Sequence, residues 1–134
     1  MIDTEDKTYI DLTKYRGDAS TSFTGRPEGR SARSELMLDQ KDQDGLKYIV
    51  KIPVNTSALN PSFYLGLFFD SIKTLGVNSF EEKYVIQYDS KESPDKVRII
   101  SRDISEGKRH AINQLESDSK GRGGLFRFFA NKVR

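Results

Sequence analysis

The sequence contains 134 residues, with 22 lysines and arginines, 20 aspartates and glutamates, one histidine and no cysteine. Its length predicts one domain that buries a hydrophobic core of its own. The absence of cysteine excludes disulfides, thiolate metal sites and cysteine nucleophiles, and the single histidine leaves one candidate base for hydrolytic chemistry. We therefore expect a protein that is not an enzyme and that has no catalytic residue, metal site or cofactor.

The net charge of +2 is too small to name a partner, so any electrostatic signal must be local. The acidic, polar start of the chain is unlike a signal peptide, and no apolar run approaches the roughly 18 residues of a membrane span. No transmembrane segment is predicted, and a cytoplasmic protein is expected.

The first half of the chain predicts a strand, a helix and a second strand. Residues 8–12 alternate weakly between apolar and polar side chains, which indicates an edge strand. Residues 16–30 contain several glycines and are typical of a loop, and a helix is predicted from Pro27 to Gln40. Residues 47–54 are rich in β-branched side chains and predict a central strand.

The next element is the clearest helix in the sequence. Asn60 and Pro61 are typical of a helix start, and Gly76 is typical of a helix end. The residues between them are apolar on more than the single stripe that a surface helix needs. This helix is therefore predicted either to be buried on two sides or to present an apolar surface to a partner.

The last third of the chain predicts two strands and a helix. Residues 83–88 and 96–100 indicate strands that a polar turn would join as an antiparallel hairpin. A capping-box pattern at residues 103–106 predicts the start of a helix, and residues 117–124 have the composition of a flexible linker. All these elements together predict an α/β fold with a mixed four- to five-stranded sheet and helices packed on it.

The domain is expected to span residues 1–116, followed by residues 117–134 as a linker and a basic, aromatic segment. This segment carries five basic residues and one acidic residue. Through Arg127 and Phe128 it could dock on a protein groove, on anionic lipid or on nucleic acid. The alternative is that its three phenylalanines pack back on the domain.

Three arginines cluster at the predicted start of the first helix. Arg26, Arg30 and Arg33 have the spacing i, i+4 and i+7, which places them on one side of a helix. Guanidinium groups beside the free N–H groups of a helix start suit a phosphate or carboxylate, so these arginines are predicted to bind an anion. The alternative is that they pair with carboxylates of the same chain. The surrounding glycines match no nucleotide-binding loop.

The apolar helix is the predicted partner-binding region, with Ser62, Phe63 and Phe69 as its contact residues. A phosphate on Ser62 would lie against the positive end of the helix and would add about two negative charges, which makes it an effective binding switch. The alternative is that Ser62 only assists the capping of the helix. His110, which stands among basic residues on a predicted helix, is expected to be solvated.

The order of these signals resembles the small STAS-like family, which is related to anti-sigma-factor antagonist domains. The resemblance rests on the pattern Gly25-Arg26-x-x-Gly29-Arg30-x-x-Arg33 before a helix, a β-rich strand, Ser62-Phe63 at the start of an apolar helix, and Phe80 ahead of a strand. It spans roughly residues 8–115. The family implies a mixed sheet with helices packed on it, no catalysis, a regulatory role and a histidine-kinase-like ATPase as partner. It also implies that this partner phosphorylates Ser62.

The sequence therefore leads to one main hypothesis and one alternative. The main hypothesis is a non-enzymatic regulatory or adaptor domain that binds a protein partner, such as a histidine-kinase-like ATPase, through the region of the helix over residues 61–75. A second copy of the chain is another occupant of that surface. The alternative is a phosphate, nucleotide or nucleic-acid binding protein that uses the arginine cluster and the basic tail. Binding to phosphates would weaken steeply with salt, whereas apolar docking would not.

Overall fold

The computed structural model describes residues 8–16 and 21–121, which form an α/β arrangement. The elements, in chain order, are β1 (Tyr9–Asp11), the 3-10 helix η1 (Thr13–Tyr15), β2 (Ser22–Phe23), α2 (Arg26–Glu35), α3 (Leu38–Lys41), β3 (Tyr48–Ile52), β4 (Ala58–Leu59), α4 (Pro61–Leu75), α5 (Val77–Lys83), β5 (Tyr84–Tyr88) and α6 (Pro94–Gly121). None of the helices in these ranges combines the length and the apolar character that a membrane span needs.

The main sheet is parallel and has the strand order β1-β3-β5. Tyr9 is the register partner of Ile49, and Ile49 is the partner of Val85. Strand β3 is central and β1 lies at an edge, as the sequence predicts. A second, two-stranded parallel sheet pairs β2 with β4. The predicted mixed, four- to five-stranded sheet is thus wrong in strand number and in strand directions, because the described chain has one three-stranded and one two-stranded sheet and every pairing in them is parallel.

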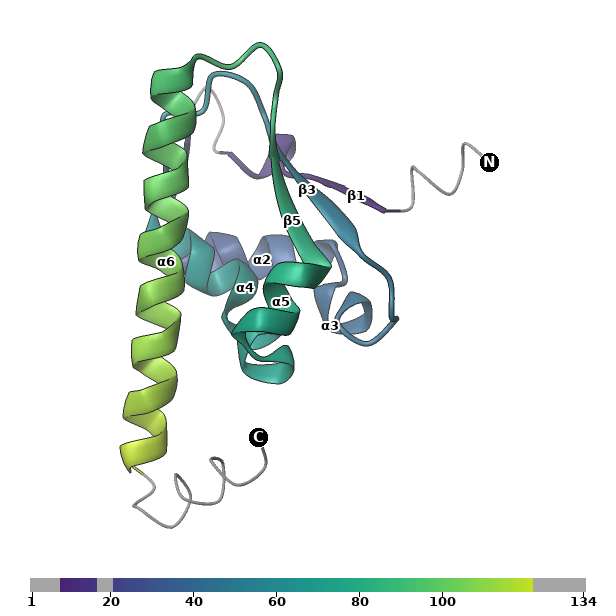
Figure 1. The fold of residues 1–134 in the computed structure, drawn as a ribbon, viewed down its shortest axis with the longest axis vertical. Helices are drawn as coiled ribbons and strands as arrows, with labels where there is room; N and C mark the ends of the chain where they lie inside the picture. Colours follow the sequence, from purple (N-terminus) through teal and green to yellow (C-terminus); the bar gives the residue numbers. More distant parts are fainter. Residues whose placement is uncertain (1–7, 17–20, 122–134) are drawn as a thin grey trace.

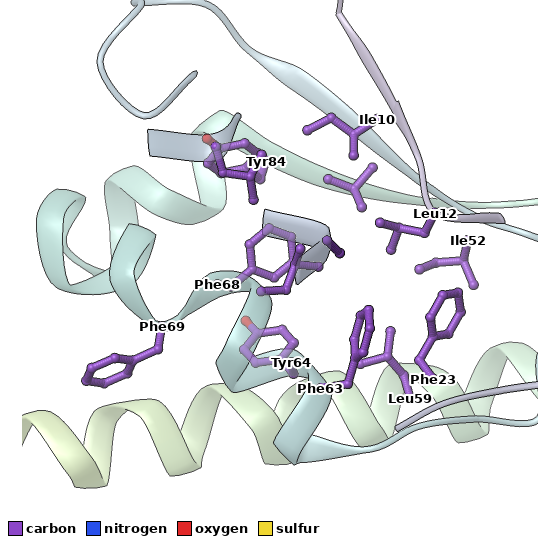
Figure 2. Close-up of a cluster of buried hydrophobic side chains, with 14 of the residues drawn as sticks. Ile10, Leu12, Phe23, Ile52, Leu59, Phe63, Tyr64, Phe68, Phe69 and Tyr84 are labelled. Carbon is purple, nitrogen blue, oxygen red and sulfur yellow. The ribbon is translucent and has the colours of Figure 1, made fainter. Parts of the chain in front are cut away.

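The molecule has three layers, with α4 in the middle. Figure 2 shows side chains of the strands, among them Ile10 and Ile52, directed toward Phe63 and Phe68 of α4, while α6 lies on the other side of α4. Helix α2 also crosses α4 closely: a Cβ atom added to Gly66 would lie 2.2 Å from the carbonyl oxygen of Arg26. Helix α4 is therefore buried on two sides, which explains why it is apolar nearly all round.

The local signals that predict α4 act as expected. The side chain of Asn60 accepts a hydrogen bond from the N–H of Ser62 at 2.8 Å, and Pro61 occupies the first turn. Gly76 ends the helix with φ of 85°, a conformation that residues with a Cβ atom rarely adopt. The predicted bounds of this helix are confirmed.

Four sequence predictions are wrong in detail, one of them the helix start at residues 103–106, which lie inside α6. The helix predicted from Pro27 to Gln40 is broken at Met37, whose φ of 57° separates α2 from α3. Residues 96–100, predicted as a strand of a hairpin, form the first turns of α6. The helix α6 also continues through Gly121, so residues 117–121 are helical and do not form a linker.

The side chains of Ser93 and Pro94, which the strand prediction did not consider, explain why α6 starts at Pro94. The hydroxyl of Ser93 accepts a hydrogen bond from the N–H of Lys96 at 3.3 Å, and Pro94 follows as the first helical residue. Ile100 and Ala111 are buried, and Ile104 packs against the core. Their spacing fits one face of a helix, so periodicity outweighs the strand preference of the β-branched residues.

Candidate functional site

The three arginines predicted to bind an anion do not form a common site. Arg33 is buried, with 7% of its surface exposed, whereas Arg30 is exposed. Arg26 is half-buried and donates a hydrogen bond to the side-chain oxygen of Gln114 on α6 at 3.3 Å. The guanidinium of Arg33 forms ion pairs within the chain, so the alternative of pairing with carboxylates holds for this residue.

Arg33 belongs to a buried polar cluster that ties several elements together. Its guanidinium contacts the Asp42 carboxylate at 2.8 Å and also donates to the hydroxyl of Ser71 at 2.8 Å. Ser71 and Tyr84 each donate to the Asp42 carboxylate, at 2.7 and 2.6 Å. Burial raises the pKa of Tyr84, and the hydrogen bond to Asp42 raises it further. The cluster is neutralised and fully partnered, which favours a structural role over ligand binding.

The apolar residues predicted to contact a partner are used inside the chain. Phe63 is completely buried and Phe69 is 8% exposed, so neither presents an apolar surface to a partner. The expectation of a free apolar face on α4 is therefore wrong, because the sheet, α2 and α6 cover that helix. Ser62 is exposed in the first turn of α4, where its N–H is held by the cap. Phosphorylation of Ser62 stays a prediction.

Two further predicted contact residues, Arg127 and Phe128, lie outside the described residues. His110 is exposed on α6, as predicted. Within residues 8–16 and 21–121, no group of three or more histidine, cysteine, aspartate or glutamate side chains is placed to hold a metal ion.

The strongest candidate surface is one that the sequence analysis did not identify: the outer face of the main sheet. Alternate residues of β3 point inward, namely Tyr48, Val50 and Ile52, and all three are buried. The residues between them point outward, and the same alternation holds in β1. In Figure 1 the labelled helices lie to one side of the three strands. We call the other side the open face.

The open face consists of two rows of side chains that run across the strands. One row is apolar and joins Tyr9, Ile49 and Val85 through the sheet register. Tyr9 is 36% exposed and Val85 is 48% exposed. The other row is polar and exposed, and its members are Asp11, Lys51 and Gln87. The Lys51 ammonium lies over the Tyr9 ring, 5.0 Å from its centroid.

The strand order explains why no helix within residues 8–16 and 21–121 covers this face. The chain moves from β1 to β3 to β5 in one direction across the sheet. Crossovers between parallel strands are almost always right-handed, so two crossovers in the same direction place their helices on the same side. The last helix, α6, then packs on α4 rather than on the sheet. Parallel sheets are normally covered on both faces, which makes an open face an unusual surface.

A cleft of about 250 Å³ lies beside the polar row, at the carboxyl ends of the three strands. Its charged lining residues are Asp11 of β1, Lys51 of β3, Arg16 in the segment after β1 and Asp89 directly after β5. The hydrogen bonds from Thr13 chiefly lower the pKa of Asp11, and the charge of Lys51 lowers it further against the effect of burial. The Asp11 carboxylate is therefore ionised at neutral pH.

No family model, no curated protein and no solved structure matches the chain. Comparison with known proteins therefore assigns no role to this surface or to the cleft.

Proposed function

We propose that this chain is a non-catalytic regulatory or adaptor domain of the cytoplasm that binds a protein partner on the open face of its parallel sheet. One observation carries the proposal: the outer face of a parallel sheet holds an exposed apolar row, and no described element covers it. Apolar side chains gathered on such a face gain free energy when they leave water, by about 25 cal/mol for each Å² that becomes buried.

The size of the open face favours a helix as the occupant. Three strands at a spacing of about 4.8 Å, each up to five residues long, span roughly 10 by 17 Å between their outer backbones. A helix with its side chains is about 10 Å wide and would cover this width. A second copy would need about 800 Å² on each partner for a stable dimer, which is several times the area of the face.

The charges of the open face indicate what such a helix carries. The Lys51 ammonium has no carboxylate within 4.0 Å among the described residues, and its contact is with the Tyr9 ring. An acidic side chain at the edge of an amphipathic helix would complement it. The apolar stripe of that helix would lie over Tyr9, Ile49 and Val85. The resemblance to STAS-like domains names a histidine-kinase-like ATPase as the partner to test first.

A matched pair of variants tests the docking surface. Val85→Lys places a charge in the middle of the apolar row, whereas Ile99→Lys places the same charge on α6, at a residue that is 39% exposed. Both positions are exposed, so both variants should fold. With a purified histidine-kinase-like ATPase from the same host, we expect Val85→Lys to weaken binding at least tenfold and Ile99→Lys to leave it unchanged.

The same pair separates the surface from the identity of the partner. If that ATPase does not bind, host proteins retained by the wild type and by Ile99→Lys but lost with Val85→Lys are purified and titrated individually. Equal binding of a purified partner by all three proteins would overturn the proposed surface. Concentration-dependent self-association that Val85→Lys abolishes would instead identify a second copy as the occupant and overturn the helix.

A further inference from the structure

The cleft lies at the carboxyl ends of β1, β3 and β5, which is the end of a parallel sheet where ligands generally bind, although the order of these three strands contains no reversal of direction, at which such sites usually form. Each of the three strands ends at the cleft and contributes a residue to its lining. The volume of about 250 Å³ is smaller than a pocket for a drug-sized molecule, for which about 300–1,000 Å³ is typical. A benzene ring fits a cavity of about 150 Å³, so this cleft suits a ligand of about ten non-hydrogen atoms.

One wall of the cleft is fixed before any ligand binds. The wall is formed by Pro53 and Val54, which begin the loop after β3. Arg16 donates through Nη1 to the carbonyl oxygens of Val54 at 3.0 Å and Asn55 at 3.2 Å. From the other side, the Glu92 carboxylate accepts the N–H of Asn55 at 2.6 Å. Asn55 has φ of 64°, a left-handed conformation that these contacts hold in place.

The polar groups at the cleft provide both signs of charge. Lys51 and Asp11 are direct register partners on neighbouring strands, yet they form no ion pair within 4.0 Å. Asp11 uses its Oδ1 atom for both hydrogen bonds from Thr13, and Asp89 uses its Oδ1 atom for the N–H of Lys91. No donor within residues 8–16 and 21–121 is bound to the Oδ2 atom of either carboxylate, so that atom can accept from a further donor.

We propose that this cleft binds a small zwitterion of the α-amino acid class. The ligand carboxylate would bind the Lys51 ammonium, and the ligand ammonium would bind between the carboxylates of Asp11 and Asp89. The side chain of the ligand would lie against Pro53 and Val54, which give the fixed wall an apolar surface. Because adjacent strands carry Asp11 and Lys51 side by side, one molecule with both charges close together satisfies both groups.

This inference goes beyond the proposed function and does not depend on it. The cleft does not include the apolar row on which a partner helix would lie, but it shares Asp11, Lys51 and Gln87 with the polar row, so a ligand carboxylate and the acidic side chain of a partner helix would compete for Lys51. Val85→Lys should therefore leave ligand binding unchanged while it weakens partner binding. Failure of one idea is distinguishable from failure of the other.

The test is a titration of the isotope-labelled full chain with L-norvaline, followed by backbone amide chemical shifts. Two analogues that each lack one charge, pentanoate and butylamine, are titrated in parallel. We expect L-norvaline to shift the amide signals of residues in the cleft with saturation in the millimolar range. Each analogue should bind at least tenfold more weakly.

Three variants complete the experiment. Lys51→Met and Asp89→Asn should each weaken L-norvaline binding at least tenfold, and Lys47→Met, which removes an exposed lysine outside the cleft, should leave it unchanged. Amide spectra of the free variants show whether each has kept its fold. Saturation by pentanoate as tight as that by L-norvaline would identify a simple anion site and overturn the proposal. Absence of any saturable shift would overturn it as well.

Discussion

At the scale of single residues, Arg33 and Asp42 form a buried ion pair, so Arg33 stabilises the fold and is not available to bind a ligand. Both side chains are almost completely buried, with 8% and 2% of their surfaces exposed. Burial alone would lower the pKa of Arg33, but hydrogen bonds to Asp39 and Asp42 outweigh it and raise the pKa. The guanidinium is thus a permanent charge inside the protein that depends on its partners.

Arg33→Met should destabilise the fold by about 3–5 kcal/mol, because it leaves the Asp42 carboxylate buried without its counter-charge. Arg30→Met, on the exposed side of the same helix, is the matched control and should change stability by less than about 0.5 kcal/mol. Urea denaturation of the two variants measures both values. Equal losses in the two variants would contradict the structural role of Arg33.

Tyrosine hydroxyl groups that donate hydrogen bonds to carboxylates should make the folded state less stable at alkaline pH. Burial, followed by the hydrogen bond to Asp44, raises the pKa of Tyr48 to about 12. The hydroxyl of a tyrosine in the unfolded chain ionises near pH 10, so the folded state holds the hydroxyl proton of Tyr48 more tightly than the unfolded state does. The stability that this proton contributes is present below pH 10 and is lost as the pH rises from about 10 to 12.

The free energy of unfolding, measured in urea at a series of alkaline pH values, should therefore fall over that interval. Tyr48→Phe removes one of the protons involved, so its profile should be flatter than that of the wild type. Parallel profiles for the two proteins would show that Tyr48 titrates as it does in the unfolded chain, which contradicts the prediction.

At the scale of elements, the close crossing of α2 and α4 depends on two glycines. A Cβ atom on Gly29 would lie 2.3 Å from the carbonyl oxygen of Phe63, and one on Gly66 would lie 2.2 Å from that of Arg26. Both obstacles are backbone atoms, which cannot rotate away. The spacing between the two helices is therefore set by the absence of side chains at the crossing.

Gly66→Ala should destabilise the protein by about 1–3 kcal/mol through overpacking, although alanine is the better helix former. Thr74→Ala, at an exposed position of α4, is the control and should have little effect. The double variant Gly29→Ala with Gly66→Ala should lose less stability than the two single variants lose together, because either substitution alone already separates α2 from α4. Thermal denaturation of the four variants measures these differences. A gain in stability for Gly66→Ala would contradict the crossing.

The elements that the sequence predicts well are those with local signals. Helix α4 has its cap, its first-turn proline and its terminal glycine, and each acts within a few residues. The break at Met37 has no such signal, because Met37, an exposed residue, takes the left-handed conformation that glycine or asparagine usually takes at the end of a helix. The open face was also beyond prediction, since each strand shows the same alternation whichever side the helices occupy. The ion pair joins Arg33 of α2 to Asp42 at the end of α3, and Ser71 of α4 and Tyr84 of β5 also bond to Asp42, which spacing along one helix cannot reveal.

At the scale of the whole molecule, residues 8–16 and 21–121 contain an apolar core that is packed between three layers. The buried apolar residues extend from Ile10 to Ala111, and the sheet, α4 and α6 supply the three layers. Phe80 illustrates how tightly the core is packed, since its ring lies 5.0 Å from the ring of Phe68 and 5.5 Å from that of Tyr84. The two rows of the open face and the exposed residues of the cleft lie outside this core, so these side chains can change without loss of the fold, whereas Ile52 belongs to both the cleft and the core.

A chain that ends at Gly121 should therefore melt within about 4 °C of the full chain, because about 1 kcal/mol shifts a domain of this size by only a few degrees. Phe80→Ala provides the contrast: loss of a buried ring destabilises a core by about 3–5 kcal/mol, so this variant should melt about 10 °C lower or more. Circular dichroism during heating measures all three proteins. If the shortened chain melts as low as Phe80→Ala, residues 122–134 complete the core, and their phenylalanines are then not available to dock on a partner. If it melts with the full chain, those residues are free for docking, and the stability of the domain rests on the layers around α4 alone.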